Sequence, residues 1–218
     1  MSYDLIRNAI DRFAAPDGVA MDVGANMGVI TRFMAERFGT VVAFEANPDL
    51  AAALASTMPA NVTVVPMLVG DRFGSRAFHI DTREGVGAVA SSVHRLVGME
   101  EQTRTIDVEA ITLDAHCART GECPTLIKID AEGAEPEIIR GARDIIMAHR
   151  PVLIFEFWET WYNAGFKDVF SYLSRVGYGM SVLETGEDVQ TAYVARDGAL
   201  NREGRTADIL AVHSGKPG

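Results

Sequence analysis

Small residues follow a short apolar segment near the start of the sequence, in the run Asp22-Val23-Gly24-Ala25-Asn26-Met27-Gly28. Such residues let the backbone turn tightly between a strand and a helix and approach a ligand closely. A dinucleotide fingerprint would read G-x-G-x-x-G and would hold a pyrophosphate at the helix N-terminus. This run has one glycine fewer, and the Asp22 carboxylate that begins it would repel a pyrophosphate. The run therefore disfavours a dinucleotide as the ligand.

Two carboxylates are associated with this turn. Asp22 begins it, and Glu45 ends the next predicted strand, 23 residues later. A carboxylate at Asp22 suits a ligand with an ammonium group, such as the methionine part of S-adenosylmethionine, and Glu45 is placed to accept ribose hydroxyls. Two plainer interpretations stay open: Asp22 as a buried acid that caps the amides of the turn, and Glu45 as an exposed charge. Together the turn and the two carboxylates favour S-adenosylmethionine as the cofactor.

A second group of charged residues comes later in the chain. Lys128 and Asp130 share a face of a predicted strand, because side chains alternate along a strand, and Glu132 and Glu135 follow in a short loop. A lysine in an apolar strand is costly unless it is paired. We therefore interpret Lys128 as a structural cation held by neighbouring carboxylates, and a direct catalytic role is the less favoured alternative.

Crowded carboxylates raise one another's pKa values, which provides a general base near neutral pH. We predict that Asp130, Glu132 and Glu156 are the catalytic residues and that Asp130 also contacts the cofactor. Positioning of the acceptor is the alternative source of catalysis, since methyl transfer needs at most one base. The same three carboxylates suit magnesium or calcium, but we do not favour a divalent cation and predict no metal site. For Glu135, the alternative is a favourable interaction with a helix N-terminus.

These residues lie at the ends of alternating strands and helices. Apolar runs predict strands at Val19–Val23, Thr40–Glu45, Val62–Pro66, Leu126–Asp130, Val152–Phe157 and Ile209–Val212. Helical spacing predicts helices within residues 1–17, at Ile30–Phe38 with Gly39 closing the helix, at Asn47–Met58, from Pro136 through Ile146, and at Val169–Val176. The alternation predicts right-handed crossovers and a parallel sheet.

The alternation lapses at residues 72–110, where short β-like pieces and the Gly-rich stretch Gly85–Ser92 replace the expected helix. Irregular chain of that length in a compact domain is usually functional or mobile. Two interpretations stay open, a lid over the site and a plain hairpin, and His94 would serve as a base only if a lid folds inward. A chain of 218 residues is too short for two comfortable domains, so we predict one domain over residues 1–218.

Composition and charge limit the partners. A net charge of -10 disfavours nucleic acid and anionic membranes, because phosphate binding needs clustered Lys and Arg. We see no signal peptide, and the longest apolar stretch, Pro151–Trp158, is too short to span a bilayer. Cys117 and Cys123 are predicted to be reduced thiols of a cytoplasmic protein, with a local disulfide or a redox role less favoured.

Several segments resemble the hallmark segments of the FkbM-type methyltransferases. The matching segments, in chain order, are Met21–Gly28, Val42–Pro48, Thr112–Asp114, Leu126–Glu135 and Arg140–Ala142. The likeness covers roughly Ala20 to Phe157. One departure is Ala46, where the family usually has proline, and this change would loosen the turn without removing Glu45.

The resemblance implies an α/β, Rossmann-like class I methyltransferase fold: a mostly parallel seven-stranded sheet with helices on both faces and an antiparallel last strand. It implies S-adenosylmethionine as the cofactor and methyl transfer, usually to a hydroxyl oxygen of a sugar, glycan or polyketide-like small molecule. It also implies which residues hold each part of the cofactor: Asp22, Gly24, Asn26 and Gly28 the methionine part, Glu45 and Asn47 the ribose, and Met67 and Leu68 the adenine.

Two other functions stay open. An NAD(P)-dependent oxidoreductase is disfavoured by the missing glycine and by Asp22, and a cofactor-binding protein that has lost catalysis is the third hypothesis. Trp158, Trp161 and Tyr162 follow a predicted strand and would either line an acceptor pocket or pack in the core. No motif identifies the acceptor or the oligomeric state.

Overall fold

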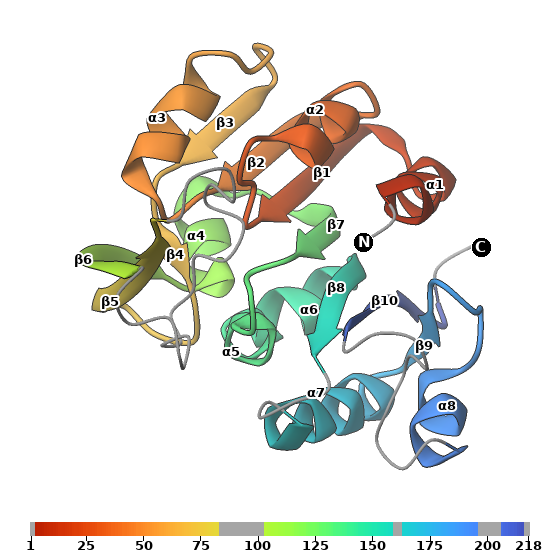
Figure 1. Cartoon of the computed structure of the whole chain (residues 1–218). Coiled ribbons are helices and arrows are strands. Elements are labelled where there is room, and N and C mark those ends of the chain that lie inside the picture. Colours follow the sequence, from red (N-terminus) through yellow and green to blue (C-terminus); the bar gives the residue numbers. More distant parts are fainter. Residues whose placement is uncertain (1–2, 83–102, 159–162, 196–205, 216–218) are drawn as a thin grey trace.

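The computed structural model describes residues 3–82, 103–158, 163–195 and 206–215 (Figure 1). Its main sheet has seven strands in the order β3-β2-β1-β7-β8-β10-β9. These strands are β1 (Ala15–Val23), β2 (Phe38–Phe44), β3 (Val62–Val65), β7 (Pro124–Ile129), β8 (Val152–Trp158), β9 (Tyr178–Val182) and β10 (Thr206–His213). Neighbouring strands pair in parallel, except that β10 is antiparallel to both β8 and β9. The structure confirms the predicted α/β fold with its antiparallel last strand.

Helices cover both faces of the main sheet. One face carries α1 (Tyr3–Arg12), α2 (Val29–Ala35) and α3 (Pro48–Ala55), and the other carries α4 (Leu113–Thr120), α5 (Glu135–Arg140), α6 (Arg143–His149), α7 (Asn163–Arg175) and α8 (Val189–Ala195). Alternate strand residues supply the two cores: Val41 packs toward the first group of helices and Val42 toward the second. Because both faces are covered, these strands are continuous apolar runs. The sequence pattern predicts neither α4 nor α8 nor β9.

The boundary between α2 and β2 differs from the prediction of one helix at Ile30–Phe38 closed by Gly39. The helix α2 ends at Ala35, and Phe38 is the first residue of β2. Gly39 lies inside β2, where a Cβ would be 2.5 Å from the carbonyl oxygen of Pro16. The glycine therefore permits the close approach of β1 and β2 rather than closing a helix. The N-terminal helix also ends early, at Arg12.

The single helix predicted from Pro136 through Ile146 is divided into α5 and α6. Between them, the Gly141 carbonyl accepts a hydrogen bond from the amide of Asp114, at 3.0 Å. The Asp114 carboxylate in turn accepts from the amides of Asp144 (3.1 Å) and Ile145 (3.0 Å). These bonds satisfy donors at the start of α6 as a capping residue does. A contact from α4 thus divides one apolar pattern into two helices.

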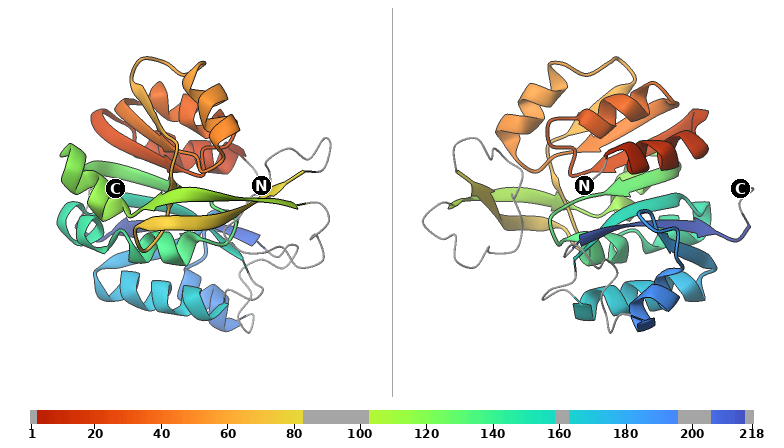
Figure 2. Two further views of the ribbon diagram at one scale, coloured as in Figure 1. Left: turned by 90° about the vertical axis from the view of Figure 1, so that its left-hand side faces the viewer. Right: turned by 45° about the vertical axis from the view of Figure 1, so that its right-hand side comes forward.

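The segment at residues 72–110 is partly regular, which corrects the expectation of an irregular insertion. The strands β5 (Gly74–Asp81) and β6 (Thr103–Ile111) pair antiparallel, and β6 also pairs with β4 (Leu68–Val69) in a second sheet. Figure 2 shows the two long strands side by side, projecting beyond the main sheet. The hairpin interpretation therefore holds for the two flanks.

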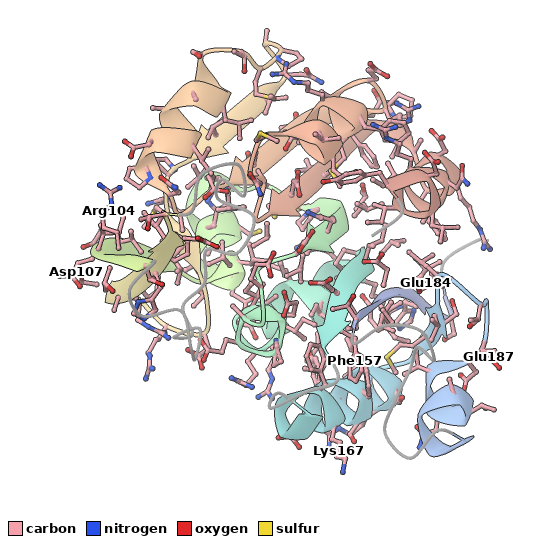
Figure 3. All side chains as sticks on the ribbon, viewed as in Figure 1. Arg104, Asp107, Phe157, Lys167, Glu184 and Glu187 are labelled. Carbon is pink, nitrogen blue, oxygen red and sulfur yellow. The ribbon has the colours of Figure 1, made fainter. Side chains whose placement is uncertain are left out.

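The β5–β6 hairpin is anchored by a small core and by a charge pair. Phe78 and Ile80 pack with buried apolar residues of β4 and β6. Arg104 of β6 (Figure 3) pairs with Asp49 at the start of α3, at 3.4 Å. The lid hypothesis rests on Gly85–Ser92 and on the role assigned to His94, which all lie outside the described residues.

Both cysteines are free thiols, as predicted. Cys117 is buried in the main core and Cys123 is exposed, so the alternative of a disulfide between them is wrong. Burial raises the pKa of the Cys117 thiol to about 12, which keeps it protonated and unreactive. Among the described helices, none is long and apolar enough to cross a membrane.

Candidate functional site

A cavity of about 350 Å³ opens at the carboxyl ends of β1, β2, β7 and β8. In open α/β sheets this edge is where ligands bind. The volume is at the lower end of the range of ligand pockets, roughly 300–1,000 Å³. The loop into α2, the strands β4 and β5, and the first residue of α1 complete the wall. The wall thus joins strands that are far apart in sequence.

The structure places the predicted site residues in two groups. Eight of them line the cavity: Gly24, Asn26, Glu45, Met67, Leu68, Asp130, Glu132 and Glu156. Three of the predicted cofactor residues lie behind the described wall of the cavity: Asp22, Gly28 and Asn47. The sequence therefore placed most of the predicted residues in the wall, but it did not show which of them support the wall from behind.

Gly24 joins the turn after β1 to the turn after β7. Its φ is 80°, and a Cβ there would lie 1.9 Å from the carbonyl oxygen of Asp130. Only glycine permits this contact between two backbones. The Asp130 amide also donates to the Val23 carbonyl at 3.0 Å, which fixes the two turns against each other.

Glu45 is a buried carboxylate that holds the turn after β1. Its Oε2 accepts a hydrogen bond from the Asn26 amide and its Oε1 accepts one from the Asn47 amide, each at 2.8 Å. Burial raises the pKa of Glu45, and the two amides partly oppose this effect. A carboxylate oxygen accepts about two hydrogen bonds, so each oxygen retains one acceptor site beyond its amide partner. The interpretation of Glu45 as an exposed charge is wrong, since only 6% of it is exposed.

Asn47 supports the site through the helix that follows it. Its side-chain oxygen accepts from the amides of Asp49 (3.1 Å) and Leu50 (3.5 Å), as an N-cap residue does. Pro48 takes the first position of α3, where the missing N–H costs nothing. The side-chain oxygen of Asn47 is thus committed to the helix, and its backbone N–H to Glu45.

Asp22, Lys128 and Asp130 form a row of charges in which Asp22 and Lys128 are buried and Asp130 is partly exposed, and Lys128 and Asp130 line the cavity. The Lys128 ammonium lies 3.3 Å from Oδ1 of Asp22 and 3.4 Å from Oδ2 of Asp130, and the Thr31 hydroxyl donates to Oδ2 of Asp22 at 2.6 Å. Burial alone would lower the pKa of Lys128, but the two carboxylates outweigh burial and raise it. Lys128 is therefore the paired structural cation that the sequence suggested. Asp22 binds a hydroxyl and an ammonium rather than capping backbone amides.

Glu132 occupies an unusual backbone conformation at the cavity wall. Its φ is 51°, in the left-handed region, which costs a glutamate about 1–3 kcal/mol unless the surroundings enforce it. Burial raises the pKa of Glu132 to about 8, the charges of Asp130 and Glu135 add to the rise, and Lys128 opposes it. A strained residue with such a pKa in a cavity marks a candidate general base.

Asp208 is a buried carboxylate that the sequence pattern does not identify. It lies opposite Glu156 in the antiparallel register of β8 and β10, so the two side chains share a face of the sheet. Burial raises the pKa of Asp208 to about 7, and the charges of Glu184 and Asp130 add to the rise. Figure 3 shows Glu184 beside β10, after the end of β9. The signal for Asp208 is the strand register, which a single sequence does not contain.

Apolar residues form the rest of the wall and its rim. Met67 and Leu68 line the cavity, as predicted for residues that flank adenine. At the mouth, Tyr3, Met27 and Val29 are exposed by 47%, 69% and 37%. The aromatic candidates are at the end of β8 and after it. The described part of the chain does not include Trp161, Tyr162 or the side chain of Trp158.

The carboxylates of the wall do not assemble into a metal centre in the described structure. Within residues 3–82, 103–158, 163–195 and 206–215, no group of three or more His, Cys, Asp or Glu side chains is arranged to hold an ion. Lys128 supplies an ammonium at the base of the same wall. The less favoured hypothesis of a divalent cation thus gains no support from these side chains.

Comparison with known protein families identifies the family of this chain. Residues 22–180 match the family model described as the methyltransferase FkbM domain. No curated protein matches the chain. The match extends past Phe157, where the resemblance seen in the sequence ends, into α7 and β9.

Three solved structures share the fold. Methyltransferase FkbM from Methylobacillus flagellatus KT is 15% identical with a TM-score of 0.55, and the match covers 90% of this chain and 44% of that one. An rRNA methylase from Streptococcus thermophilus is 8% identical with a TM-score of 0.57, covering 98% and 96% of the two chains. SMU.1697c from Streptococcus mutans, solved in complex with S-adenosylhomocysteine (SAH), is 9% identical with a TM-score of 0.57, covering 98% and 97%. At these identities the likeness shows the fold alone.

Proposed function

Because this chain belongs to the FkbM family of methyltransferases, we propose that it uses S-adenosylmethionine to methylate a hydroxyl oxygen of a sugar, glycan or polyketide-like small molecule. The observation that carries the proposal is Glu45, a buried carboxylate in the wall at the carboxyl end of β2. Each of its oxygens accepts one amide and retains one acceptor site. Two such sites suit the two hydroxyls of a ribose.

Other residues of the wall fit the remaining parts of the cofactor. The turn at Gly24 brings the backbone close to the ligand, and Met67 and Leu68 offer an apolar surface to adenine. Asp130 and Glu156 add acidic side chains to a wall whose described lining includes one ammonium, that of Lys128, which suits a ligand that carries a sulfonium and an ammonium group. When bound, S-adenosylmethionine supplies the electrophilic methyl group.

The acidic turn after β7 acts on the acceptor. We assign Glu132 as the general base that removes the hydroxyl proton, since its pKa of about 8 matches that task. Asp130 orients the same hydroxyl. It is fixed by Lys128 and by the hydrogen bond from its own amide to the Val23 carbonyl. Glu156 is a further carboxylate of the wall and serves as a second acceptor for hydroxyl groups.

The acceptor is proposed to be a small molecule rather than a nucleic acid. The chain has 30 Asp and Glu residues against 20 Lys and Arg, so a phosphate backbone would meet a repulsive surface. The rRNA methylase of similar fold is too distant to suggest its substrate for this chain. A cytoplasmic location stays a prediction.

Calorimetry and a turnover assay test this function. We expect SAH to bind the wild-type protein and NAD not to bind, and we expect methyl transfer to a member of a panel of hydroxylated acceptors. Binding of NAD without binding of SAH would favour an oxidoreductase and contradict the proposal. Binding of SAH without turnover on any acceptor would favour a cofactor-binding protein that lacks catalysis.

A further inference from the structure

Glu135 is a buried carboxylate beside the site that has no role in the reaction proposed above. It is the first residue of α5, and its exposed fraction is 0%. Its Oε1 accepts hydrogen bonds from the amides of Ala131 (2.8 Å) and Gly133 (3.3 Å). Its Oε2 is buried and has no hydrogen-bond partner among the described residues. A buried oxygen without a partner costs stability. The two hydrogen bonds made by the other oxygen are therefore the interactions that could explain why a glutamate is buried at this position.

The two amides that Glu135 holds lie on either side of Glu132. Both Glu132 (φ 51°) and Gly133 (φ 98°) are in the left-handed region, so the chain turns sharply at the residue that lines the cavity. A glutamate keeps this conformation only where its surroundings impose it. One oxygen that accepts both neighbouring amides imposes it directly.

Other contacts fix different parts of the same turn. The Asp130 amide donates to the Val23 carbonyl at 3.0 Å, and the Ala134 amide donates to the Ala131 carbonyl at 3.2 Å. The first bond attaches the start of the turn to β1, and the second closes the turn onto α5. Glu135 fixes the peptide groups between them, which carry Glu132.

We propose that Glu135 is a positioning residue that determines where the Glu132 carboxylate lies in the cavity, and that it thereby controls turnover rather than cofactor binding. The inference rests on the proposed function, because it takes Glu132 as the group that accepts the proton of the acceptor. In this arrangement Glu135 acts as a hydrogen-bond acceptor, and its charge is not required.

Because Glu135 is only partly ionised near pH 7, a conservative uncharged replacement is informative. Burial raises the pKa of Glu135 to about 7, and the amide of Ala131 opposes the rise. An uncharged amide of the same shape therefore keeps the essential interaction. In Glu135→Gln, the side-chain carbonyl accepts from the same two amides, whereas Glu135→Ala removes the acceptor.

Steady-state kinetics and calorimetry with SAH test the proposal on the full chain. We expect Glu135→Ala to lower kcat by about 10- to 100-fold, with the Kd for SAH changed by less than about 2-fold, because misplacing a catalytic group affects the reaction more than binding. We expect Glu135→Gln to restore kcat to within about 3-fold of the wild type. Glu137→Gln is the matched control, since Glu137 lies on the same helix and pairs with Arg76 at 3.3 Å, away from the cavity. An unchanged kcat in Glu135→Ala overturns the inference.

A double variant separates positioning from general loss of structure. In a Glu132→Gln background, Glu135→Ala should lower kcat by no more than about 2-fold, because residues that act as a unit are not additive. A full further loss there contradicts the inference. Should Glu135→Ala fail to fold, Glu135→Met removes the acceptor and retains the side-chain volume, and the same outcomes apply.

Amide hydrogen exchange gives a readout that does not depend on activity. Exchange at the Ala131 and Gly133 amides should be faster in Glu135→Ala than in the wild type, and the Glu137→Gln control should match the wild type. Unchanged exchange at both amides overturns the inference. If the wild type transfers no methyl group to any acceptor, the proposed function fails, and the exchange comparison still tests whether Glu135 holds the turn.

Discussion

Two turns at the edge of the cavity are each built around a buried glutamate, and they use it differently. Glu45 accepts the amides of Asn26 and Asn47 with one oxygen each, whereas Glu135 accepts two amides with a single oxygen. Each turn contains a non-glycine residue in the left-handed region, Asn26 in the first and Glu132 in the second. Glu45 lines the cavity itself, but Glu135 lies behind the wall and the residue it holds lines the cavity.

The difference indicates that a buried glutamate that accepts backbone amides can serve a site in two ways. Where the glutamate faces the cavity, as Glu45 does, the side chain that fixes the turn is also the one that we propose binds the ligand. Where the glutamate faces only backbone, as Glu135 does, it presents another carboxylate to the cavity. The two turns meet at the contact between Gly24 and the Asp130 carbonyl, so a shift in one displaces the other. In the proposed function, binding and reaction thus belong to adjacent but distinct turns.

The largest expected effect comes from removing the cation that lies between the two turns. In Lys128→Met, Asp22 stays fully buried and Asp130 partly buried without the ammonium that pairs them, so we expect the free energy of unfolding to fall by about 3–5 kcal/mol. Urea denaturation measures this change. The control is Lys167→Met, on the exposed surface of α7 (Figure 3), which should change stability by less than about 0.5 kcal/mol. Equal stability of the two variants would mean that Lys128 does not join the turns.

The next effect tests whether the turn after β7 serves reaction rather than binding. We expect Asp130→Asn to lower kcat by about 100-fold while the Kd for SAH changes by less than about 3-fold, because the variant disturbs the group that orients the acceptor. Kinetics and calorimetry measure the two quantities, with Asp168→Asn on the exposed surface of α7 as the control. An equal loss in both would make Asp130 a cofactor residue only.

The sequence predicted the turns because their signals are local. The glycines after β1, the carboxylate at the end of β2 and the acidic run after β7 each follow an apolar strand, and parallel strands bring such ends to one edge. Eight predicted site residues accordingly lie in the wall of the cavity. The fold class followed from the same alternation of strands and helices.

Features that depend on distant contacts were not predictable from the pattern. Gly39 resembles a helix end, but it serves the approach of β1 to β2, and Asp114 divides the helix that follows β7. Asp208 lies beside Glu156 through the register of β10, the last strand in sequence. Asp22 has the predicted position, but Lys128 and Thr31 bind its carboxylate behind the wall. In each case a partner remote in sequence decides the role.

A smaller effect tests the turn that is proposed to bind the cofactor. We expect Glu45→Ala to weaken binding of SAH by about 1–3 kcal/mol, because a charged hydrogen-bond acceptor is lost. Calorimetry measures the change, and Glu45→Gln should lose less, since its carbonyl still accepts. The control is Asp49→Asn, an exposed acid near the same turn that pairs with Arg104. Unchanged affinity in Glu45→Ala would mean that the ribose lies elsewhere.

The smallest expected effect is a pH dependence that belongs to the second turn alone. Burial, together with the charges of Asp130 and Glu135, raises the pKa of Glu132 to about 8, so below that pH the carboxyl is protonated and does not accept a proton. We therefore expect kcat/KM to rise by about 10-fold between about pH 7 and pH 9, since this ratio follows the ionisation of the free enzyme. In Glu132→Gln the residual rate should be flat over the same range. The Kd for SAH should vary much less, because Glu45 rather than Glu132 faces the ribose. A rise of kcat/KM of the same size in Glu132→Gln would assign the titration to another group. It would also contradict the proposal that the second turn serves the reaction and the first turn serves binding.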